Sequence, residues 1–452
     1  MGIRKEATEV KAGGAVLVRE PVWGTIHVDG TAHRIIDSAA FQRLRYIRQL
    51  GFAHLVYPGA NHTRFDHALG VYHLIRRALT SMARQGELEE LTEAEQRLVP
   101  LAGLLHDVGH YPFSHALEEL EEPLIPGHHE TLTGRFLADP DVRAALESVA
   151  PDGADQVELL IRGRSPSPLQ GLVSGSLDLD KIEYLKRDAR FCGVPYGEVD
   201  VDRLLQALVL ETPPEGGAAE VGVDEKGVAA LESLLFSKYQ MYRNVYWHHA
   251  VRAATVLYKR IVYDSLRIGL LAPAELVGKT DEALLFLLSE RASAHGAAEA
   301  QQVGRMVASL QGRRLPKRVI ELVAADLLPE GGEWARLDTS LKRAVEDRLA
   351  EEMGLERGWV FVDYPSKPGM FRLDLLVRRH DGGVLRLGPA GRAGLIGLPA
   401  VADELYRTAR VLRLFALAPP RRVPPASAVA GVVAMGPNEV EQRLAAQHAL
   451  LT

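Results

Sequence analysis

The hydrophobic pattern predicts a chain built mainly of helices. Between residues 35 and 265, apolar positions repeat at the spacing of one helix face, most clearly over residues 68–84 and 98–108. A strand-like start covers residues 14–28, where Pro and Gly mark turns. The first half of the chain is therefore expected to be a helical body preceded by short strands.

A predicted loop interrupts the helical body, and the helical pattern continues after it. Residues 152–171 are predicted to form a loop, because Gly, Pro and Ser concentrate there, and another helix is predicted to open near Asp178. Residues 272–356 keep the helical pattern and contain few aromatic residues. A helical extension is therefore expected after the main body.

The period of the pattern changes near Trp359. Segments 360–363, 371–377 and 384–387 alternate or run apolar between Gly and Pro turns, as β-strands do, and residues 404–416 fit either helix or strand. The predicted fold class is mainly α, with a smaller C-terminal α+β module. The expected division is residues 1–265 for the N-terminal strands and main helical body, 266–356 for the helical extension and 357–452 for the α+β module.

The composition is that of an ordinary globular protein. With 452 residues, 47% hydrophobic and 25% charged, the chain is long enough for a sizeable core and for more than one domain. The longest apolar runs fall short of the roughly 20 residues of a membrane-spanning helix. No membrane partner is expected, and the formal net charge of -6 gives no support for nucleic acid as a partner. The single cysteine, Cys192, excludes an internal disulfide and favours a cytoplasmic protein.

A histidine and an aspartate stand side by side at the end of an apolar, helix-like run. His106 and Asp107 follow Leu101-Ala-Gly-Leu-Leu. An unpaired carboxylate in such a setting is costly, whereas imidazole nitrogen and carboxylate oxygen are ordinary ligands of Mn, Fe, Zn or Mg. The pair predicts a divalent metal site.

His67 and Asp180 are the other candidate ligands. With His106 and Asp107 they would supply two nitrogen and two oxygen ligands and leave positions for water and a phosphate oxygen. Taken singly, His67 could cap a helix and Asp180 could start one, and a lone histidine is more often structural than a ligand. The combination with a buried His-Asp pair favours a hydrolytic metal site.

Further polar groups follow the pair closely. His110, His115 and Glu118 come next, and His129 lies in a His128-His129-Glu130 cluster that could equally be an exposed turn. Histidine titrates near neutral pH, so it can supply the acid that a phosphoester hydrolase needs. Arg64 precedes His67 by three residues and could grip a phosphate, or form a surface ion pair with Asp66.

Two later segments could contact a nucleotide. Lys181, Tyr184 and Asp188 share one predicted helix, where Lys181 could meet phosphate and the other two a ribose or base. The charge density there also fits a solvated, ion-paired helix face. The segment from Lys238 to His249, which includes Tyr246, is rich in Tyr, Trp and His, and is explained by packing or by binding.

The ordered motifs closely resemble one known family, the HD-domain deoxynucleoside triphosphate (dNTP) triphosphohydrolases. Members include bacterial enzymes and an animal enzyme with a sterile-alpha-motif domain, of which no segment is present here. The matching residues run from about Val18 to Leu257 and continue weakly through Arg313 to Lys317. They are Asp37…Phe41-Gln42-Arg43-Leu-Arg45, Gln49-Leu50-Gly, Arg64-Phe-Asp-His67, His106-Asp107-Val-Gly-His110-Tyr-Pro-Phe-Ser-His115, His129-Glu130 and Asp178-Leu-Asp180-Lys181.

The resemblance implies an HD-domain helical body over residues 1–265 and cleavage of a dNTP to deoxynucleoside and inorganic triphosphate. It implies a divalent metal, Mn, Mg or Fe, held by His67, His106, Asp107 and Asp180. It implies phosphate-binding and acid–base roles for Arg64, His110, His115, Glu118 and His129, with His115 as the general acid. The implied substrate contacts are Gln49, Leu50, Lys181, Tyr184, Asp188, Lys238 and Tyr246, of which Tyr246 excludes a ribose 2′-hydroxyl.

The resemblance also implies regulation and assembly. Asp37, Gln42 and Arg45 match a guanine-reading activator site, and Lys226, Arg313 and Lys317 match contacts to a second nucleotide. A homotetramer activated by a dNTP or GTP between its subunits is the expected form. Val16 stands where a phosphate-binding lysine is expected, which weakens the implied activator site.

Three departures affect the implied active site. Glu118 replaces an aspartate and can still orient His110, but would shift it. Lys238 replaces a phosphate-facing arginine and loses its bidentate geometry while keeping the charge. Trp247 replaces a glutamine that helps to hold the base. Two other functions stay open at this point: another HD-class phosphohydrolase or phosphodiesterase, and a non-catalytic nucleotide sensor or single-stranded nucleic-acid binder.

Overall fold

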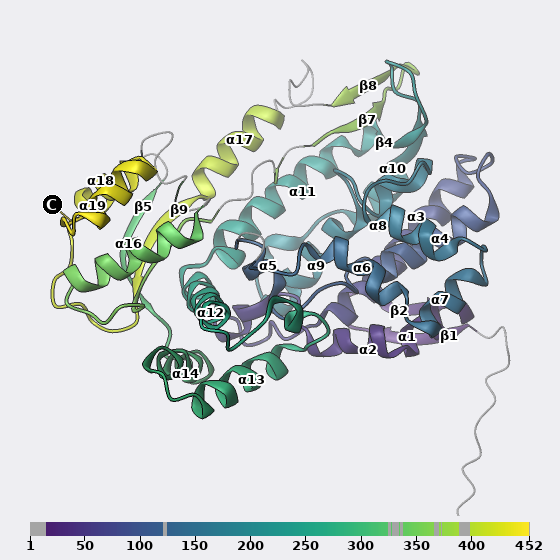
Figure 1. Cartoon of the computed structure of the whole chain (residues 1–452). Helices are drawn as coiled ribbons and strands as arrows, with labels where there is room; N and C mark the ends of the chain where they lie inside the picture. The colour runs from purple at the N-terminus through teal and green to yellow at the C-terminus, as the bar shows by residue number, and fades with distance from the viewer. Residues whose placement is uncertain are drawn as a thin grey trace, which may run out of the picture.

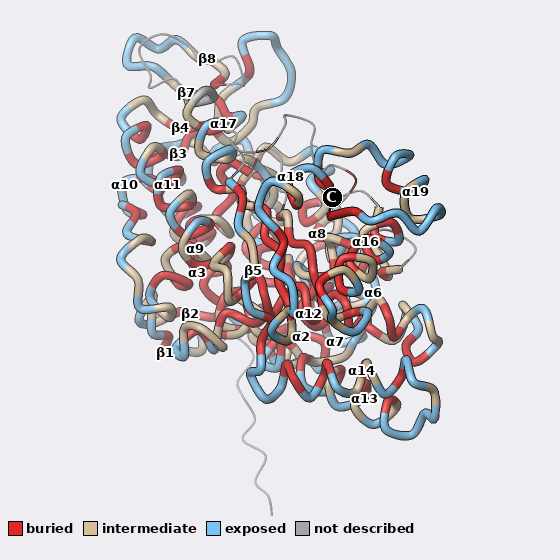
Figure 2. Tube along the Cα trace, turned by 90° about the vertical axis from the view of Figure 1, so that its left-hand side faces the viewer, coloured by how far each residue is buried: buried red, intermediate tan, exposed pale blue. Residues whose placement is uncertain are grey.

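The computed structural model describes residues 15–120, 124–323, 327, 334, 338–365, 370–371, 373–387 and 398–451. It is mainly α-helical, as predicted, with short strands at the periphery of a helical body (Figure 1). Buried residues concentrate in the middle of this body, where the helices pack on one another (Figure 2). No described helix is long and apolar enough to cross a membrane.

The described elements have the following bounds. The helices of the first half are α1 (Gly30–Asp37), α2 (Ala39–Gln42), α3 (Arg64–Arg84), α4 (Glu93–Leu105), α5 (Ser114–Leu117), α6 (His129–Leu137), α7 (Pro140–Glu147), α8 (Gly153–Ile161), α9 (Leu179–Cys192) and α10 (Val201–Ala207). The later helices are α11 (Val228–Met241), α12 (His249–Arg267), α13 (Asp281–Ala294), α14 (Ala298–Gln311), α16 (Thr339–Glu352), α17 (Leu398–Ala409), α18 (Ala426–Ala434) and α19 (Pro437–Ala445). The strands are β1 (Val16–Glu20), β2 (Gly24–Val28), β3 (Leu208–Glu211), β4 (Glu220–Asp224), β5 (Lys317–Val323), β6 (Val360–Asp363), β7 (Leu375–Arg378), β8 (Val384–Leu387) and β9 (Val411–Ala416).

Three helix ends position the polar residues that the sequence singled out. Helix α3 begins after Thr63, whose backbone N–H donates to the Asp66 carboxylate at 2.9 Å. Helix α9 begins after Asp178, which accepts from the Lys181 N–H at 3.1 Å. Helix α4 ends at Leu105, immediately before His106. Side-chain caps of this kind fix where each helix starts, and therefore where its first-turn residues lie.

Helix α3 packs against both α4 and α9, which brings these helix ends together. Gly70 of α3 makes the close approach to α9 possible, because a Cβ at this position would overlap the Glu183 carboxylate. Apolar side chains of α3 such as Leu69, Tyr72 and Ile75 are buried in the core of the body, where Ile75 lies against Gly103 of α4. The helices predicted over residues 68–84 and 98–108 are thus confirmed, although α4 ends three residues earlier than expected.

The predicted strands form, but they pair in a way that the sequence does not show. Within the described residues, the sheets have the orders β1-β2, β3-β4-β7-β8 and β5-β9-β6. Strand β7 pairs in parallel with β4 of the N-terminal half, whereas β6 pairs antiparallel with β9. The strands expected in one C-terminal module therefore lie in two sheets at opposite ends of the molecule, with α17 between them (Figure 1).

Three local predictions were wrong. Part of the loop expected over residues 152–171 is helix α8, whose Val157, Leu160 and Ile161 are buried. Strands β3 and β4 form a hairpin inside the region where helix was expected to follow helix. Strand β5 interrupts the helical pattern expected over residues 272–356, because it pairs with β9 across nearly a hundred residues of chain. In each case a tertiary contact overrides the local composition.

The helical extension is attached to the main body through a buried carboxylate. Asp281, at the start of α13, is fully buried and accepts from the backbone N–H of Arg48 at 2.9 Å. The guanidinium of Arg48 lies 3.5 Å from the same carboxylate and 2.6 Å from that of Glu282. Burial raises the pKa of the Asp281 carboxyl from its ordinary 3.8 to about 6, although its contacts with Arg48 oppose this shift.

Replacing Asp281 by asparagine is expected to change how stability depends on pH. Because the folded-state pKa of Asp281 is raised, its stabilising contribution is complete below about pH 4 and is lost as the pH rises through about 6. The free energy of unfolding of Asp281→Asn minus that of the wild type should therefore rise by up to roughly 3 kcal/mol between pH 4 and pH 7. Urea unfolding across this range measures the difference, and a difference independent of pH would contradict the assignment.

Candidate functional site

A cavity of about 750 Å³ lies where the ends of α3 and α4 meet α9 and α12. It brings together nearly all of the residues that the sequence marked for metal, catalysis or substrate. Those that line it are Gln49, Leu50, Arg64, His106, Asp107, His110, His115, Glu118, His129, Asp180, Lys181, Tyr184, Asp188, Lys238 and Tyr246. Among the residues predicted for metal, catalysis or substrate, only His67 does not line the cavity. It is fully buried.

Four side chains from three helix ends converge at one point beside the cavity. The Nε2 atoms of His67 and His106 lie 3.2 Å apart. The Asp180 Oδ1 atom is 2.9 Å from Nε2 of His67 and 3.6 Å from Nε2 of His106. The Asp107 Oδ1 atom is 3.3 Å from Nε2 of His106. Ligand atoms about 2.1 Å from one metal and at right angles to each other are about 3 Å apart, so these separations fit a shared ion.

The outer nitrogen of each imidazole is held by a different acceptor. Nδ1 of His67 donates to Glu183 at 2.6 Å, and Nδ1 of His106 donates to the Gly103 carbonyl at 2.8 Å. A proton on Nδ1 leaves Nε2 as the ligating nitrogen, which is the usual arrangement around protein metal sites. Both rings are therefore oriented for a cation at the point where their Nε2 atoms meet.

The charge of the cluster also fits a cation. Burial opposes a charge on His67, yet its hydrogen bonds to Asp180 and Glu183 prevail and raise its pKa to about 10. Burial also opposes ionisation of Asp107, but the charges of Arg64 and His106 hold its pKa well below the ordinary value. Ionised carboxylates thus surround the buried imidazoles, and the negative charge that holds a proton on His67 would also favour a metal ion in place of that proton.

Arg64 forms an ion pair, but its partner is Asp107 and not Asp66. It is buried at the start of α3, and its Nη1 atom donates to the Asp107 carboxylate at 2.6 Å. Asp66 is occupied by the helix cap and is not its partner. Arg64 therefore reaches the cavity next to the four proposed metal ligands, where it fixes one of them and its positive charge could meet an anion.

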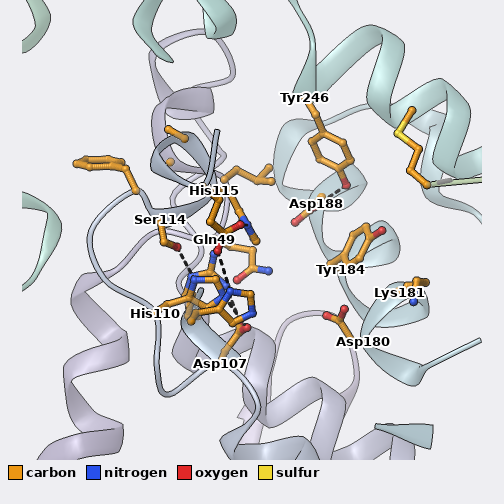
Figure 3. Close-up of a pocket in the computed structure, with 18 of the residues that line it drawn as sticks. Gln49, Asp107, His110, Ser114, His115, Asp180, Lys181, Tyr184, Asp188 and Tyr246 are labelled. Carbon is orange, nitrogen blue, oxygen red and sulfur yellow. Dashed lines mark hydrogen bonds and ion pairs between the residues drawn. The ribbon is translucent and has the colours of Figure 1, made fainter. Parts of the chain in front are cut away.

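A second wall of imidazoles stands beside the cluster (Figure 3). The His110 and His129 rings stack with their centroids 3.7 Å apart, and Nε2 of His110 lies 3.0 Å from Asp107. This approach requires Gly109, because a Cβ there would overlap the backbone of His129. Burial, Arg64 and His129 lower the pKa of His110 well below its ordinary value. His110 is therefore neutral at physiological pH.

Glu118 joins two of these histidines, His115 and His129. Its carboxylate accepts from Nδ1 of His129 at 2.8 Å and from Nδ1 of His115 at 3.1 Å. Burial opposes its ionisation, but the two histidines hold its pKa far below the ordinary value. Ser114, rather than Glu118, contacts Nδ1 of His110. The expectation that Glu118 orients His110 directly is therefore not met, because the two oxygens of its carboxylate are engaged by His115 and His129.

The opposite wall of the cavity comes from α9 and the π-helical turn Tyr242–Tyr246 (Figure 3). Tyr246 donates to Asp188 at 2.6 Å, and burial raises the pKa of its hydroxyl well above the ordinary value, so it stays protonated. Tyr184 lies beside it, with ring centroids 6.3 Å apart. Lys181 donates to the Gly175 carbonyl at 2.7 Å, and the Nζ atom of Lys238 contacts the Met370 carbonyl.

The residues expected to regulate the protein lie away from the cavity lining. Gln42 accepts from Arg45 at 2.8 Å, and Asp37 ends the neighbouring α1, so these three are close in sequence and space. Lys226 lies 3.6 Å from Asp224 in the segment after β4. Arg313 donates to the Leu55 carbonyl at 2.7 Å, and Lys317 is exposed at the start of β5. Their expected role in activation stays a prediction.

Sequence reasoning missed three residues that support the site. Glu183 follows Asp180 by three residues on α9, so helical spacing could have indicated it. Ser114 contacts His110, and His62 binds Asp188 at 2.7 Å. His62 and Asp188 are far apart in the chain, and no local pattern joins them.

Replacing Glu183 by glutamine is expected to weaken metal binding by about 10- to 100-fold, the usual effect of losing a carboxylate behind a ligating histidine. The loss arises because glutamine no longer fixes the charge and orientation of the His67 ring. Calorimetric titration of the metal-stripped protein with Mn²⁺ measures the affinity. Glu198→Gln, at an exposed position just after α9, is the matched control and should leave the affinity unchanged. Equal affinities for both variants would exclude a supporting role for Glu183.

The chain matches two known family regions. Residues 64–152 match the HD domain, and residues 199–390 match the HD associated region. It is 33% identical to an uncharacterized protein of Methanocaldococcus jannaschii over 373 residues, which are 82% of this chain and 73% of that protein. It is 30% identical to the deoxynucleoside triphosphate triphosphohydrolase SAMHD1 of Bos taurus over 265 residues, 51% of this chain. The match covers only 44% of the bovine protein.

Solved structures show the same fold. A phosphohydrolase of Bacteroides thetaiotaomicron superposes with a TM-score of 0.67 at 21% identity, over 89% of this chain and 100% of that one. A hypothetical protein of Aquifex aeolicus superposes with a TM-score of 0.64 at 28% identity, over 89% and 96% of the two chains.

Proposed function

The chain belongs to the HD-domain phosphohydrolase family, and on this basis we propose that it cleaves a deoxynucleoside triphosphate to deoxynucleoside and inorganic triphosphate. One observation carries the proposal: the cavity has the proposed metal ligands and imidazoles on one wall, and two tyrosines with a carboxylate on the other (Figure 3). The first wall suits a triphosphate, and the second suits a sugar. The relatives named deoxynucleoside triphosphate triphosphohydrolase SAMHD1 support the same substrate class.

His67, His106, Asp107 and Asp180 would hold the divalent metal, Mn, Mg or Fe. When bound, such an ion activates water as a nucleophile and neutralises phosphate charge. Arg64, already fixed on Asp107, presents its positive charge where the phosphates bind, and Lys181 and Lys238 add charge from α9 and α11. Positive groups placed in advance stabilise the negative charge that develops as the phosphoester bond breaks.

His115 is the proposed general acid. Nδ1 of His115 donates a hydrogen bond to Glu118. Nε2 is therefore the nitrogen that remains available to a substrate in the cavity. An ionised carboxylate behind an imidazole favours the protonated ring, which can then give a proton to the leaving 5′ oxygen. His129 shares the same carboxylate and packs on the neutral His110 ring, so it keeps the imidazole wall in place.

The sugar is proposed to lie between Tyr184 and Tyr246. Tyr246 is held by its bond to Asp188 and by edge contact with Tyr242, at a centroid separation of 4.9 Å. A π-helical turn inserts one extra residue into a helix and is often found at functional sites. Here the turn ends at Tyr246, which would crowd the 2′ position of a ribose.

Assembly and activation are part of the same proposal. Asp37, Gln42 and Arg45 are proposed to read a guanine base, and Lys226, Arg313 and Lys317 to contact a second nucleotide. The supporting observation is that Arg45 and Gln42 are joined by a hydrogen bond near the end of α1, on a surface separate from the cavity. A dNTP or GTP bound there in a homotetramer would act as the activator.

The test is a product analysis with the full chain, Mn²⁺ or Mg²⁺, and every pairing of one dNTP substrate with another dNTP or GTP as activator. We expect equal amounts of inorganic triphosphate and deoxynucleoside from at least one pairing. Release of pyrophosphate or single phosphate, or hydrolysis of nucleoside monophosphates or signalling nucleotides alone, would instead assign a different HD phosphohydrolase activity. Nucleotide binding without any product would assign a sensor.

A further inference from the structure

His62 is a buried histidine that none of the preceding chemistry uses. Its side chain is fully buried, and its Nε2 atom donates to Oδ1 of Asp188 at 2.7 Å. The ring packs on Phe191 with centroids 4.7 Å apart. His62 does not line the cavity, whereas Asp188 does. His62 therefore lies directly behind a cavity residue.

Asp188 is held from both sides. Oδ1 accepts from His62, and Oδ2 accepts from the Tyr246 hydroxyl at 2.6 Å. Two donors on the two oxygens fix the rotation of the carboxylate, and each oxygen keeps a second lone pair for another donor. The remaining lone pair that faces the cavity can accept a hydroxyl of a bound molecule.

His62 is kept despite a cost to the fold. Its Nδ1 atom is buried without a hydrogen-bond partner among the described residues. Unpartnered polar atoms are uncommon in protein interiors and are expected where another demand on the residue outweighs their cost. The backbone carbonyl of His62 also accepts from the N–H of Gln49, another cavity residue, at 3.1 Å. The segment carrying His62 is thus tied to the cavity at two points.

We propose that His62 is a positioning residue for sugar recognition: it orients Asp188 so that this carboxylate, together with Tyr246, accepts the 3′-hydroxyl of the deoxynucleotide. This inference rests on the proposed function, because it takes a deoxynucleotide as the ligand. A 2′-deoxynucleotide carries one sugar hydroxyl, so a fixed acceptor beside the sugar has one group to read. His62 therefore controls how strongly the protein distinguishes nucleotides with a 3′-hydroxyl from nucleotides without one.

The test uses two substitutions that differ in where they place an amide nitrogen. The glutamine amide reaches the position of Nε2, whereas the asparagine amide reaches only that of Nδ1. His62→Asn should raise KM for the dNTP substrate by roughly tenfold, the effect of weakening one hydrogen bond to a charged group. It should leave kcat and the KM of the matching 2′,3′-dideoxynucleotide within about twofold. His62→Gln should restore most of the discrimination.

Two results would overturn the proposal. Equal effects of His62→Asn on both nucleotides would show a merely structural role, and a wild type with the same KM for both would show that Asp188 does not read the hydroxyl. His62→Gln keeps a donor at the position of Nε2, so it keeps the test decisive if His62→Asn does not fold: loss of the discrimination between the two nucleotides in folded His62→Gln would overturn the proposal.

Failure of the proposed function gives a different result. A wild type that releases no triphosphate from either nucleotide contradicts that function. The His62 proposal is then decided by calorimetric binding of dATP, dGTP and their 2′,3′-dideoxy counterparts to the metal-stripped protein. Tighter binding of the deoxynucleotide, lost in His62→Asn and restored in His62→Gln, supports it. Equal binding of the two nucleotides overturns it.

Discussion

The protein carrying both His106→Ala and Asp107→Ala is expected to bind no metal at the cluster and to hydrolyse dNTP at least roughly 10³-fold more slowly than the wild type. The substitutions remove two of the four proposed ligands, and with them the several kcal/mol of transition-state stabilisation that a catalytic metal supplies. Metal content by elemental analysis and initial rates of triphosphate release measure the two effects together.

The double variant also has a structural consequence. Loss of Asp107 leaves the buried Arg64 without its partner, which is expected to cost about 3–5 kcal/mol of stability. His106→Ala alone keeps that pair and should still lose metal and activity. His380→Ala with Asp381→Ala is the matched control, because the same dipeptide lies there in an exposed turn between β7 and β8. Wild-type rates in the folded double variant would contradict a catalytic metal site.

His115→Asn is expected to lower kcat by roughly 10²- to 10⁴-fold, the usual contribution of a general acid. Metal content should not change, because His115 contacts Glu118 and is not one of the proposed ligands. The effect should depend on the leaving group. In a triphosphate ester of 4-nitrophenol, the leaving group is 4-nitrophenolate, which needs no proton to depart. The variant should therefore hydrolyse this ester at nearly the wild-type rate.

His128→Asn is the control for this second prediction, because His128 is exposed at the start of α6 and does not line the cavity. It should retain wild-type rates on both substrates. If His115→Asn slowed both esters equally, His115 would be assigned to phosphate binding and not to proton transfer.

The residues that the sequence grouped as a candidate site lie together around one cavity, whereas several local elements of the fold were not predicted. His106 and Asp107 stood out because a charged pair at the end of an apolar helix needs a partner, and residues on α3 and α9 meet them at the expected place. The supporting contacts were not predictable in the same way. His62 meets Asp188, and Arg64 meets Asp107, only because separate helices pack together.

The errors in the fold have a common physical origin. Helix α8 lies in a Gly- and Ser-rich stretch, and its buried Val157 and Leu160 decide its structure more than that composition does. Strand β7 showed its strand period in the sequence, but not that β4 would be its partner. Periodicity reports which face of a segment is buried, whereas pairing depends on contacts that are distant in the chain.

The most direct test of the central claim is hydrolysis in ¹⁸O-labelled water by the wild-type protein with Mn²⁺. Attack of water on the α-phosphorus within this cavity predicts one labelled oxygen in the inorganic triphosphate and none in the deoxynucleoside. This transfer should stop when the metal is removed with a chelator and return when it is added back. Labelled single phosphate or pyrophosphate in place of labelled triphosphate, or unchanged hydrolysis without metal, would contradict the account.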